Sequence, residues 1–324
     1  MTGSAHLMTD MPHTMRSAAR QPNSRPAVLA AAACAMAAAI GGCTSAVAGS
    51  GGSPSAAQAG GHRQRAPSPV PAAVTLRRVV LPDGHAVTVA RFSGDVRFVL
   101  HCGSSDPGAA ALKAVKAGPA VRQPASRSLV AAFNGGFKLS AGVGGYEQEG
   151  RIIRPLAPGR ASLVIYRSGA VGIGVWGHGV PRTGHPVLSV RQNLGLLVAD
   201  GHPTPAAANW RAWGATITRA ELVARSAVGQ NGRGQLIYAA SMAASPADLA
   251  AALVEFGART GMELDINPEW VQLAYAASPG GRLLTGLRGQ VRPADQYLRG
   301  WTRDFIAVMA TWLPVTAPGV HVVP

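Results

Sequence analysis

The feature that most limits the possible folds of this chain is a set of three pairs of β-rich runs. A short turn sequence joins the two runs of each pair. The first pair surrounds residues 81–84, where Pro82 presets one backbone dihedral angle and the glycine at position 84 accepts a positive one. The other two pairs surround 167–169 and 230–234. We therefore expect three β-hairpins and a mainly antiparallel arrangement of strands.

A helical pattern is clear at one place. Ser245 is a typical N-cap, Pro246 suits the first helical position, and Asp248 complements the positive end of the helix dipole. The 40 glycines and 24 prolines among 324 residues argue against many long helices. The sequence predicts an α+β fold with mixed or antiparallel sheets and a few packed helices, as a single domain after a signal and a linker.

The first 43 residues have the pattern of an export signal. Three arginines precede the uncharged run 27–40, which is shorter than the roughly 20 residues that a spanning helix needs. The sequence 40–43 resembles the bacterial lipobox, in which Cys43 becomes the lipid-modified first residue. That interpretation predicts a lipoprotein on the outer face of the cytoplasmic membrane. Ordinary cleavage near Ala46 or Ala48, giving a secreted protein, is the alternative.

The composition divides the rest of the chain into a linker and a domain. Residues 44–73 are mostly Ser, Gly, Ala, Pro and Gln, and we expect them to be a disordered tether. The folded domain is expected over 74–324, with a β-rich N-terminal part over 74–127 and a core over 128–324.

The net charge of +15 does not by itself indicate a nucleic-acid partner. The arginines are scattered, and no compact basic run or aromatic-interleaved basic strand accompanies them. We therefore expect no nucleic acid among the partners. Three cysteines cannot build a disulfide framework, and the common nucleophile, zinc and phosphate-loop motifs are missing.

Polar residues come after an apolar strand at Asn134, Gly135 and Gly136. Paired glycines let backbone amides approach a ligand, and the asparagine amide can both donate to and accept from a sugar hydroxyl or a phosphate oxygen. The sequence predicts a substrate-binding segment here. A tight turn after a core strand is the alternative.

A second group of candidate substrate-binding residues comprises Arg191, Asn193, Asp200 and Gly229, and Arg225 is a candidate catalytic residue. Arginine within a strand sequence is expected to face solvent or an anion, and its planar guanidinium suits phosphate oxygens. From the sequence, ligand binding and structural ion pairing remain equally open for both arginines.

A third group lies at the end of a predicted strand over 262–266. Strand alternation places Glu263 and Asp265 on one face, and Pro268 holds Asn267 and Glu269 near the strand exit. Such carboxylates can act as acid and base or hold a hard cation such as calcium. A solvated face is the alternative.

The order of these groups resembles the phosphodiester glycosidase domain family over roughly residues 128–275. The family's Asn-x-Gly-Phe motif falls on Asn134, Gly136 and Phe137, and its Arg-Ser-Ala-Val-Gly motif falls on 225–229. Its Leu-Asp-Gly-Gly-Gly-Ser motif falls on 264–265, but the glycines are replaced by Ile-Asn-Pro-Glu. The resemblance implies a hydrolase acting at a sugar-1-phosphodiester. From the chemistry of the side chains, Asp265, Arg225 and Glu269 are the catalytic candidates.

Three functions therefore compete. The first is an exported hydrolase of phosphodiester-linked sugars, with cell-envelope glycopolymers as candidate substrates, whose Asn134, Arg191, Arg225 and Asp265 converge on one cleft. The second is a non-catalytic surface lipoprotein that binds an anionic glycan, which the missing glycines and the positive charge favour. The third is a structural envelope lipoprotein without a ligand.

Overall fold

The computed structural model describes residues 72–82, 84–215 and 219–311. The predicted export signal, Cys43 and nearly all of the predicted linker lie outside these residues. Among the described residues, no helix is long and apolar enough to cross a membrane.

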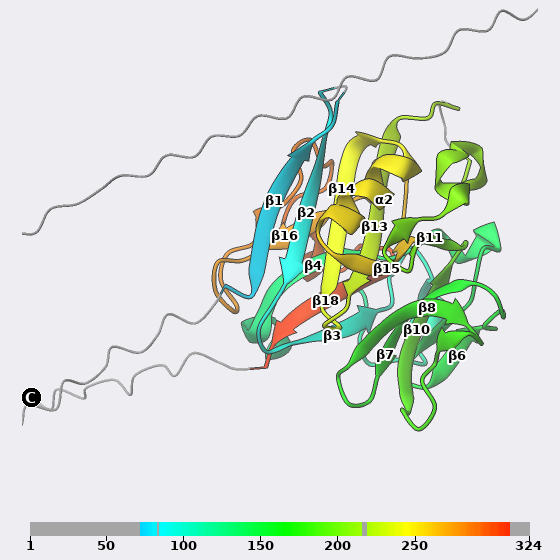
Figure 1. The fold of residues 1–324 in the computed structure, drawn as a ribbon. Helices are drawn as coiled ribbons and strands as arrows, with labels where there is room; N and C mark the ends of the chain where they lie inside the picture. Colours follow the sequence, from blue (N-terminus) through cyan, green and yellow to red (C-terminus); the bar gives the residue numbers. More distant parts are fainter. Residues whose placement is uncertain (1–71, 83, 216–218, 312–324) are drawn as a thin grey trace, which may run out of the picture. The chain divides into compact units, whose positions relative to one another are not determined.

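Most of the regular structure is β-sheet (Figure 1). The strands are β1 (Val74–Val80), β2 (Ala86–Phe92), β3 (Val96–His101), β4 (Leu129–Asn134), β5 (Tyr146–Gln148), β6 (Arg151–Arg154), β7 (Ala161–Tyr166), β8 (Val171–Trp176), β9 (Gly179–Val180), β10 (Val187–Asn193), β11 (Leu196–Ala199), β12 (His202–Pro203), β13 (Val223–Asn231), β14 (Leu236–Ala244), β15 (Ala258–Glu263), β16 (Leu273–Tyr275), β17 (Leu284–Thr285) and β18 (Phe305–Ala310). The α-helices are α1 (Ala109–Leu112), α2 (Pro246–Glu255) and α3 (Gln296–Arg299). The described part of the chain is thus mainly sheet with short helices, as expected.

The strands form three sheets. The seven-stranded sheet has the order β1-β2-β14-β13-β15-β11-β12, and the five-stranded sheet has the order β17-β16-β4-β18-β3. The six-stranded sheet has the order β6-β5-β10-β7-β8-β9. Nearly all neighbours are antiparallel, and the β8–β9 pair is parallel. The residues of the expected N-terminal part do not form a sheet of their own, because β2 pairs with β14 and β3 pairs with β18.

All three expected hairpins are present. They are formed by β1 with β2, by β7 with β8 and by β13 with β14. In the first, Val80 pairs with Ala86 across the turn that the Pro-Asp-Gly sequence predicted. Local turn chemistry therefore determined these connections.

Helix α2 begins as the sequence indicates. The Ser245 hydroxyl accepts a hydrogen bond from the Asp248 amide, and the Asp248 carboxylate accepts one from the Ser245 amide, which completes a capping box. Leu249 and Leu253 are fully buried against Val89 and Ile237 of the seven-stranded sheet. The helix therefore covers one face of that sheet.

The other face contributes to the main hydrophobic core. Phe133 of the five-stranded sheet lies 5.5 Å from Phe92 and 4.8 Å from Tyr238 of the seven-stranded sheet, measured between ring centroids. All three rings are buried in a shared cluster with residues of the six-stranded sheet, among them Leu163. This packing fixes the strand ends at which the polar residues lie.

The central pair of the five-stranded sheet positions the site. Strand β18 is antiparallel to β4, and Phe305 at its start pairs with Asn134 at the end of β4. In an antiparallel pair the exit of one strand lies beside the entrance of its neighbour. The residues that precede β18 therefore meet the residues that come after β4.

Candidate active site

The Asn134-Gly135-Gly136 segment lies against Asp304, the residue before β18. The Gly135 amide donates to the Asp304 carbonyl (2.8 Å), and the Gly136 amide donates to its carboxylate (3.3 Å). A Cβ atom at position 135 would lie 1.9 Å from Asp304 Oδ2, and one at 136 would lie 2.7 Å from Arg191 Cζ. A side chain at either position would displace the buried Arg191–Asp304 pair, which explains the two glycines.

The Asn134 side chain connects its own strand β4 to β13 and β14. Its Nδ2 donates to Ser226 Oγ of β13 (2.8 Å), and its Oδ1 accepts from the Tyr238 hydroxyl (2.7 Å) and from the Gln272 amide (3.1 Å). With its amide so occupied and buried, Asn134 connects the sheets within this network.

A cleft of about 530 Å³ opens beside this network. One part of its lining is apolar, including Phe137, Leu222, Met242 and Ile266. Polar groups also line it: Lys138, Asp265, Asn267 and Arg303. A cleft of this size, mainly apolar with a few convergent polar groups, has the character of a ligand site.

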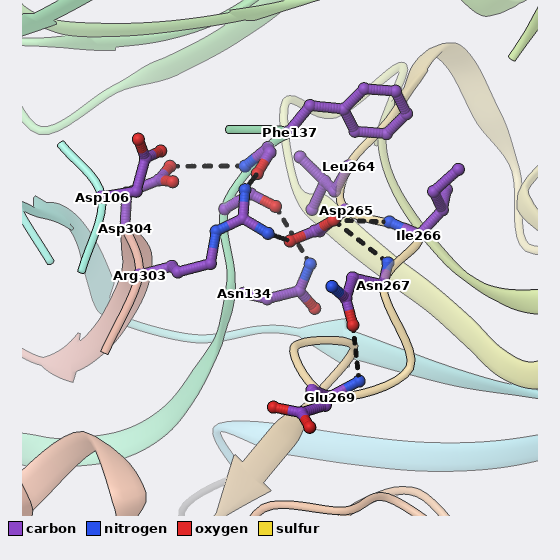
Figure 2. A network of polar contacts seen from close by, with 12 residues as sticks. Asp106, Asn134, Phe137, Leu264, Asp265, Ile266, Asn267, Glu269, Arg303 and Asp304 are labelled. Carbon is purple, nitrogen blue, oxygen red and sulfur yellow. Dashed lines mark hydrogen bonds and ion pairs between the residues drawn. The ribbon is translucent and has the colours of Figure 1, made fainter. Parts of the chain in front are cut away.

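Asp265 lies at this cleft with its carboxylate held from two directions (Figure 2). One oxygen accepts from the backbone amides of Ile266 (2.8 Å) and Asn267 (3.1 Å). The other forms an ion pair with the Arg303 guanidinium, which also donates to the Gly136 carbonyl (3.3 Å). The carboxylate therefore has a fixed orientation, as a group that acts on a substrate needs.

Burial raises the pKa of Asp265 from its ordinary value of 3.8 to about 6. Removal from water disfavours the charged carboxylate, and this effect exceeds the opposing stabilisation by Arg303 and the two backbone amides. A carboxyl group with a pKa near neutrality can exchange a proton with a substrate or a water molecule at ordinary pH.

Arg191 does not line the cleft. Its Nε donates to the Asp304 carboxylate (2.8 Å), and its other nitrogens donate to the carbonyl groups of Gln192 and Phe137. Both side chains of the Arg191–Asp304 pair are about 1% exposed. Of the two roles left open by the sequence, the structure shows ion pairing.

Arg225 likewise forms a fully buried ion pair, with Glu263 at 2.7 Å. It also donates to the Trp213 carbonyl (3.1 Å), and Asn193 donates to the Glu263 carbonyl (2.9 Å). Burial raises the pKa of Glu263 despite Arg225. Within the described residues, Arg225 Nε and Nη2, Glu263 Oε2 and Asn193 Oδ1 have no hydrogen-bond partner.

The prediction that Asn134, Arg191, Arg225 and Asp265 share one hollow therefore needs correction. Their backbones and side chains do form one hydrogen-bonded region, because Ser226 Oγ links Asn134 to the Asp265 carbonyl. Of these four residues, Asp265 lines the cleft. The two arginines are occupied by acidic partners: Glu263 of the neighbouring strand β15 for Arg225, and Asp304 before β18 of another sheet for Arg191.

Three other predicted site residues lie away from this cleft. Glu269 is 58% exposed and pairs with Arg292 (2.6 Å). Asp200 lies exposed in the turn between β11 and β12 with a φ of 51°. Gly229 lies in β13, where a Cβ atom would come within 2.9 Å of the Ala258 side chain and 3.1 Å of Leu253 of α2. Close packing of the sheet and of α2 against this position therefore explains the glycine.

Asn267, a predicted substrate-binding residue, lines the cleft. Its amide holds the Asp265 carboxylate, and its side-chain oxygen accepts from the Glu269 amide (3.0 Å). The carboxylates of Asp265 and Glu269 are paired with different arginines. Among the described residues no group of three or more His, Cys, Asp or Glu side chains is placed to hold a metal ion. A calcium site remains a prediction.

Arg303 and Asp304 are site residues that were not predicted from the sequence. They belong to a polar segment immediately before the apolar strand β18, whereas the predicted site residues lie within strands or after them. In an antiparallel sheet, polar residues before a strand reach the same edge as those after its neighbour. Polar residues at the start of an apolar run are therefore the signal that marks this pair.

No known protein family matches this sequence, and no curated protein matches it. Among solved structures, the chain is similar to the catalytic domain of zebrafish N-acetylglucosamine-1-phosphodiester α-N-acetylglucosaminidase, auto-inhibited by its pro-peptide, at 15% identity and a TM-score of 0.48. That match covers 76% of this chain and 86% of the other. A hypothetical protein from Synechocystis matches at 14% identity with a TM-score of 0.41, covering 73% and 62% of the two chains. These are distant structural similarities that concern the fold alone.

Proposed function

We propose that this chain is a hydrolase that cleaves the bond between the anomeric carbon of a sugar and a phosphodiester. The observation that carries the proposal is the arrangement at the cleft: a fixed carboxyl group, Asp265, with a pKa of about 6, beside the Arg303 guanidinium. The order of motifs in the sequence is consistent with the same chemistry. The predicted export signal and Cys43 would place the enzyme outside the cytoplasm, where its substrates are envelope glycopolymers.

The chemistry needs few groups. Asp265 accepts a proton from water as the water oxygen forms a bond to the anomeric carbon. The bond from that carbon to the phosphate oxygen breaks, and its electron pair leaves with the phosphate, which departs as a stable anion without protonation. Arg303 and Lys138 supply positive charge at the cleft for the departing phosphate. The apolar lining, including Phe137 and Ile266, excludes water from the rest of the sugar.

The direct test is release of sugar by the full-length chain from a panel of hexose and N-acetylhexosamine 1-phosphodiesters, with and without calcium. We expect an increase in reducing sugar from at least one member, and no increase with the same sugars joined by ordinary glycosidic bonds. Failure to cleave any member under both conditions contradicts the proposal.

The pH dependence of this activity follows from the raised pKa of Asp265. The base must be ionised, so kcat/KM is expected to fall about tenfold per pH unit below pH 6, the value to which burial raises this pKa. The pH dependence of stability has the opposite sign to the pH dependence of activity. A raised folded-state pKa stabilises the protonated native protein, and this contribution is lost as pH rises from about 4 through 6. The measurement is a kcat/KM profile, with thermal unfolding at each pH as its control.

One observation favours a second function, binding of an anionic glycan without cleavage. Asp265 is already neutralised by Arg303, and Ile266, Asn267 and Pro268 stand where the family that it resembles has glycines. Under that alternative, the protein binds a sugar phosphodiester but releases no sugar from it. Isothermal titration beside the hydrolysis assay separates the two functions.

A further inference from the structure

A second, larger hollow of about 660 Å³ lies next to the cleft. We call it the basic groove. One side is formed by the β1–β2 hairpin, with Arg77, Arg78 and Thr88, and the other by the segment after β17, with Arg288. Figure 1 shows the β1–β2 hairpin in blue and cyan, with orange C-terminal loops beside it. The groove thus joins two segments that are far apart in the sequence.

The groove carries positive charge that the described residues do not neutralise. Arg77, Arg78 and Arg288 are exposed, and no described acidic residue lines the groove. Within the described part of the chain, Arg78 and Arg288 form no ion pair or side-chain hydrogen bond, and Arg77 donates to the Leu76 carbonyl (3.2 Å). Unpaired guanidinium groups that line one hollow favour an anionic ligand, above all phosphate.

Protection of a sheet edge does not explain why all three arginines line the groove. Strand β1 is the edge of the seven-stranded sheet, and charged side chains on edge strands discourage association with other chains. That reason applies to Arg77 and Arg78. It does not apply to Arg288, which comes from the opposite side of the groove.

The basic groove adjoins the cleft. Met242 of β14 lines both hollows, so this side chain lies between the groove and the cleft that contains Asp265. Lys138 and Arg303 add basic side chains to the lining of the cleft. Basic groups therefore line both adjoining hollows, from Arg78 in the groove to Lys138 in the cleft.

We propose that the basic groove binds phosphate groups of a polymer on one side of the linkage that lies in the cleft. The preferred substrate is then a glycan with repeated phosphodiester groups, not a single sugar phosphodiester. This inference rests on the proposed function for the cleavage step, whereas binding in the groove can be tested without it.

The test compares a hexose-1-phosphate oligomer joined by phosphodiester bonds with the corresponding single-linkage diester. Binding is measured by isothermal titration with the full-length chain and with the double variant Arg78→Gln/Arg288→Gln. We expect the wild-type protein to bind the oligomer more tightly, and the double variant to lose about three- to tenfold in affinity for the oligomer. Arg182→Gln/Arg233→Gln, which removes two exposed arginines from outside the groove, is the matched control and should retain wild-type affinity.

Salt provides a second measurement on the unaltered protein. Preference for the oligomer should decline between 0.1 M and 1 M salt, as the screening length falls from about 10 Å to about 3 Å. The inference is overturned if oligomer and diester bind equally, or if both double variants lose the same affinity. Oligomer binding without hydrolysis of either ligand supports the groove and contradicts the hydrolase, so the two failures are distinguishable.

Discussion

Asp265→Asn is expected to lower kcat/KM for a sugar-1-phosphodiester by about 10²- to 10⁴-fold, because the amide cannot accept the proton of the attacking water. The asparagine oxygen can still accept from the amides of Ile266 and Asn267, so the loop geometry should persist. Steady-state kinetics on the full-length chain is the measurement. Asp295→Asn, which alters an exposed carboxylate paired with Arg299, is the matched control and should retain activity.

Loss of activity in one variant can also follow from a disturbed fold, since Asp265→Asn leaves Arg303 without its buried partner. A second variant separates the two causes. Arg303→Gln removes the charge that lowers the pKa of Asp265, so the acid limb of the kcat/KM profile should move above pH 6. A residue with only a structural role would not move this limb. Wild-type activity in Asp265→Asn would exclude the proposed base.

Asp304→Ala is expected to destabilise the folded chain by about 3–5 kcal/mol, because it leaves the Arg191 guanidinium buried and unpaired. It also removes the acceptor of the Gly136 amide. Domains of this size have about 5–15 kcal/mol of stability, so the loss is a large part of the total. The transition midpoint should fall by roughly 6–20 °C in a thermal unfolding experiment.

The control for this prediction is an ion pair of similar length in a different environment. Asp295 and Arg299 are also 2.8 Å apart, but their side chains are 47% and 60% exposed. Asp295→Ala should therefore cost less than about 0.5 kcal/mol. The double variant Arg191→Met/Asp304→Leu should recover stability relative to Asp304→Ala, since it removes both buried charges. Equal losses in Asp304→Ala and Asp295→Ala would contradict the assignment of Asp304 to a buried pair.

The local parts of this fold could be predicted from the sequence. The Pro82 turn and the cap at Ser245 depend on interactions within a few residues, and both appear as expected. The order of strands could not be predicted in the same way. Pairing of β2 with β14 joins segments about 150 residues apart, and no local preference encodes it.

In the candidate site, too, local features could be predicted from the sequence and long-range contacts could not. The sequence identified Asp265 and Asn267, which lie at the cleft, because polar residues after a strand are a local signal. It did not predict that Arg191 and Arg225 are buried with acidic partners, because those partners come from segments far away in the sequence. An arginine within a strand has the same local sequence whether its guanidinium binds a ligand or a carboxylate.

The place of β18 in its sheet has a consequence for synthesis of the protein. This strand lies between β3 and β4, yet it is the last strand of the described chain to leave the ribosome. Until it emerges, the nascent polypeptide lacks both the inner strand of that sheet and the arginine that pairs with Asp265. Assembly of that sheet must therefore wait until β18 has emerged, which favours a slow, late and cooperative folding step over gradual maturation from the N-terminus.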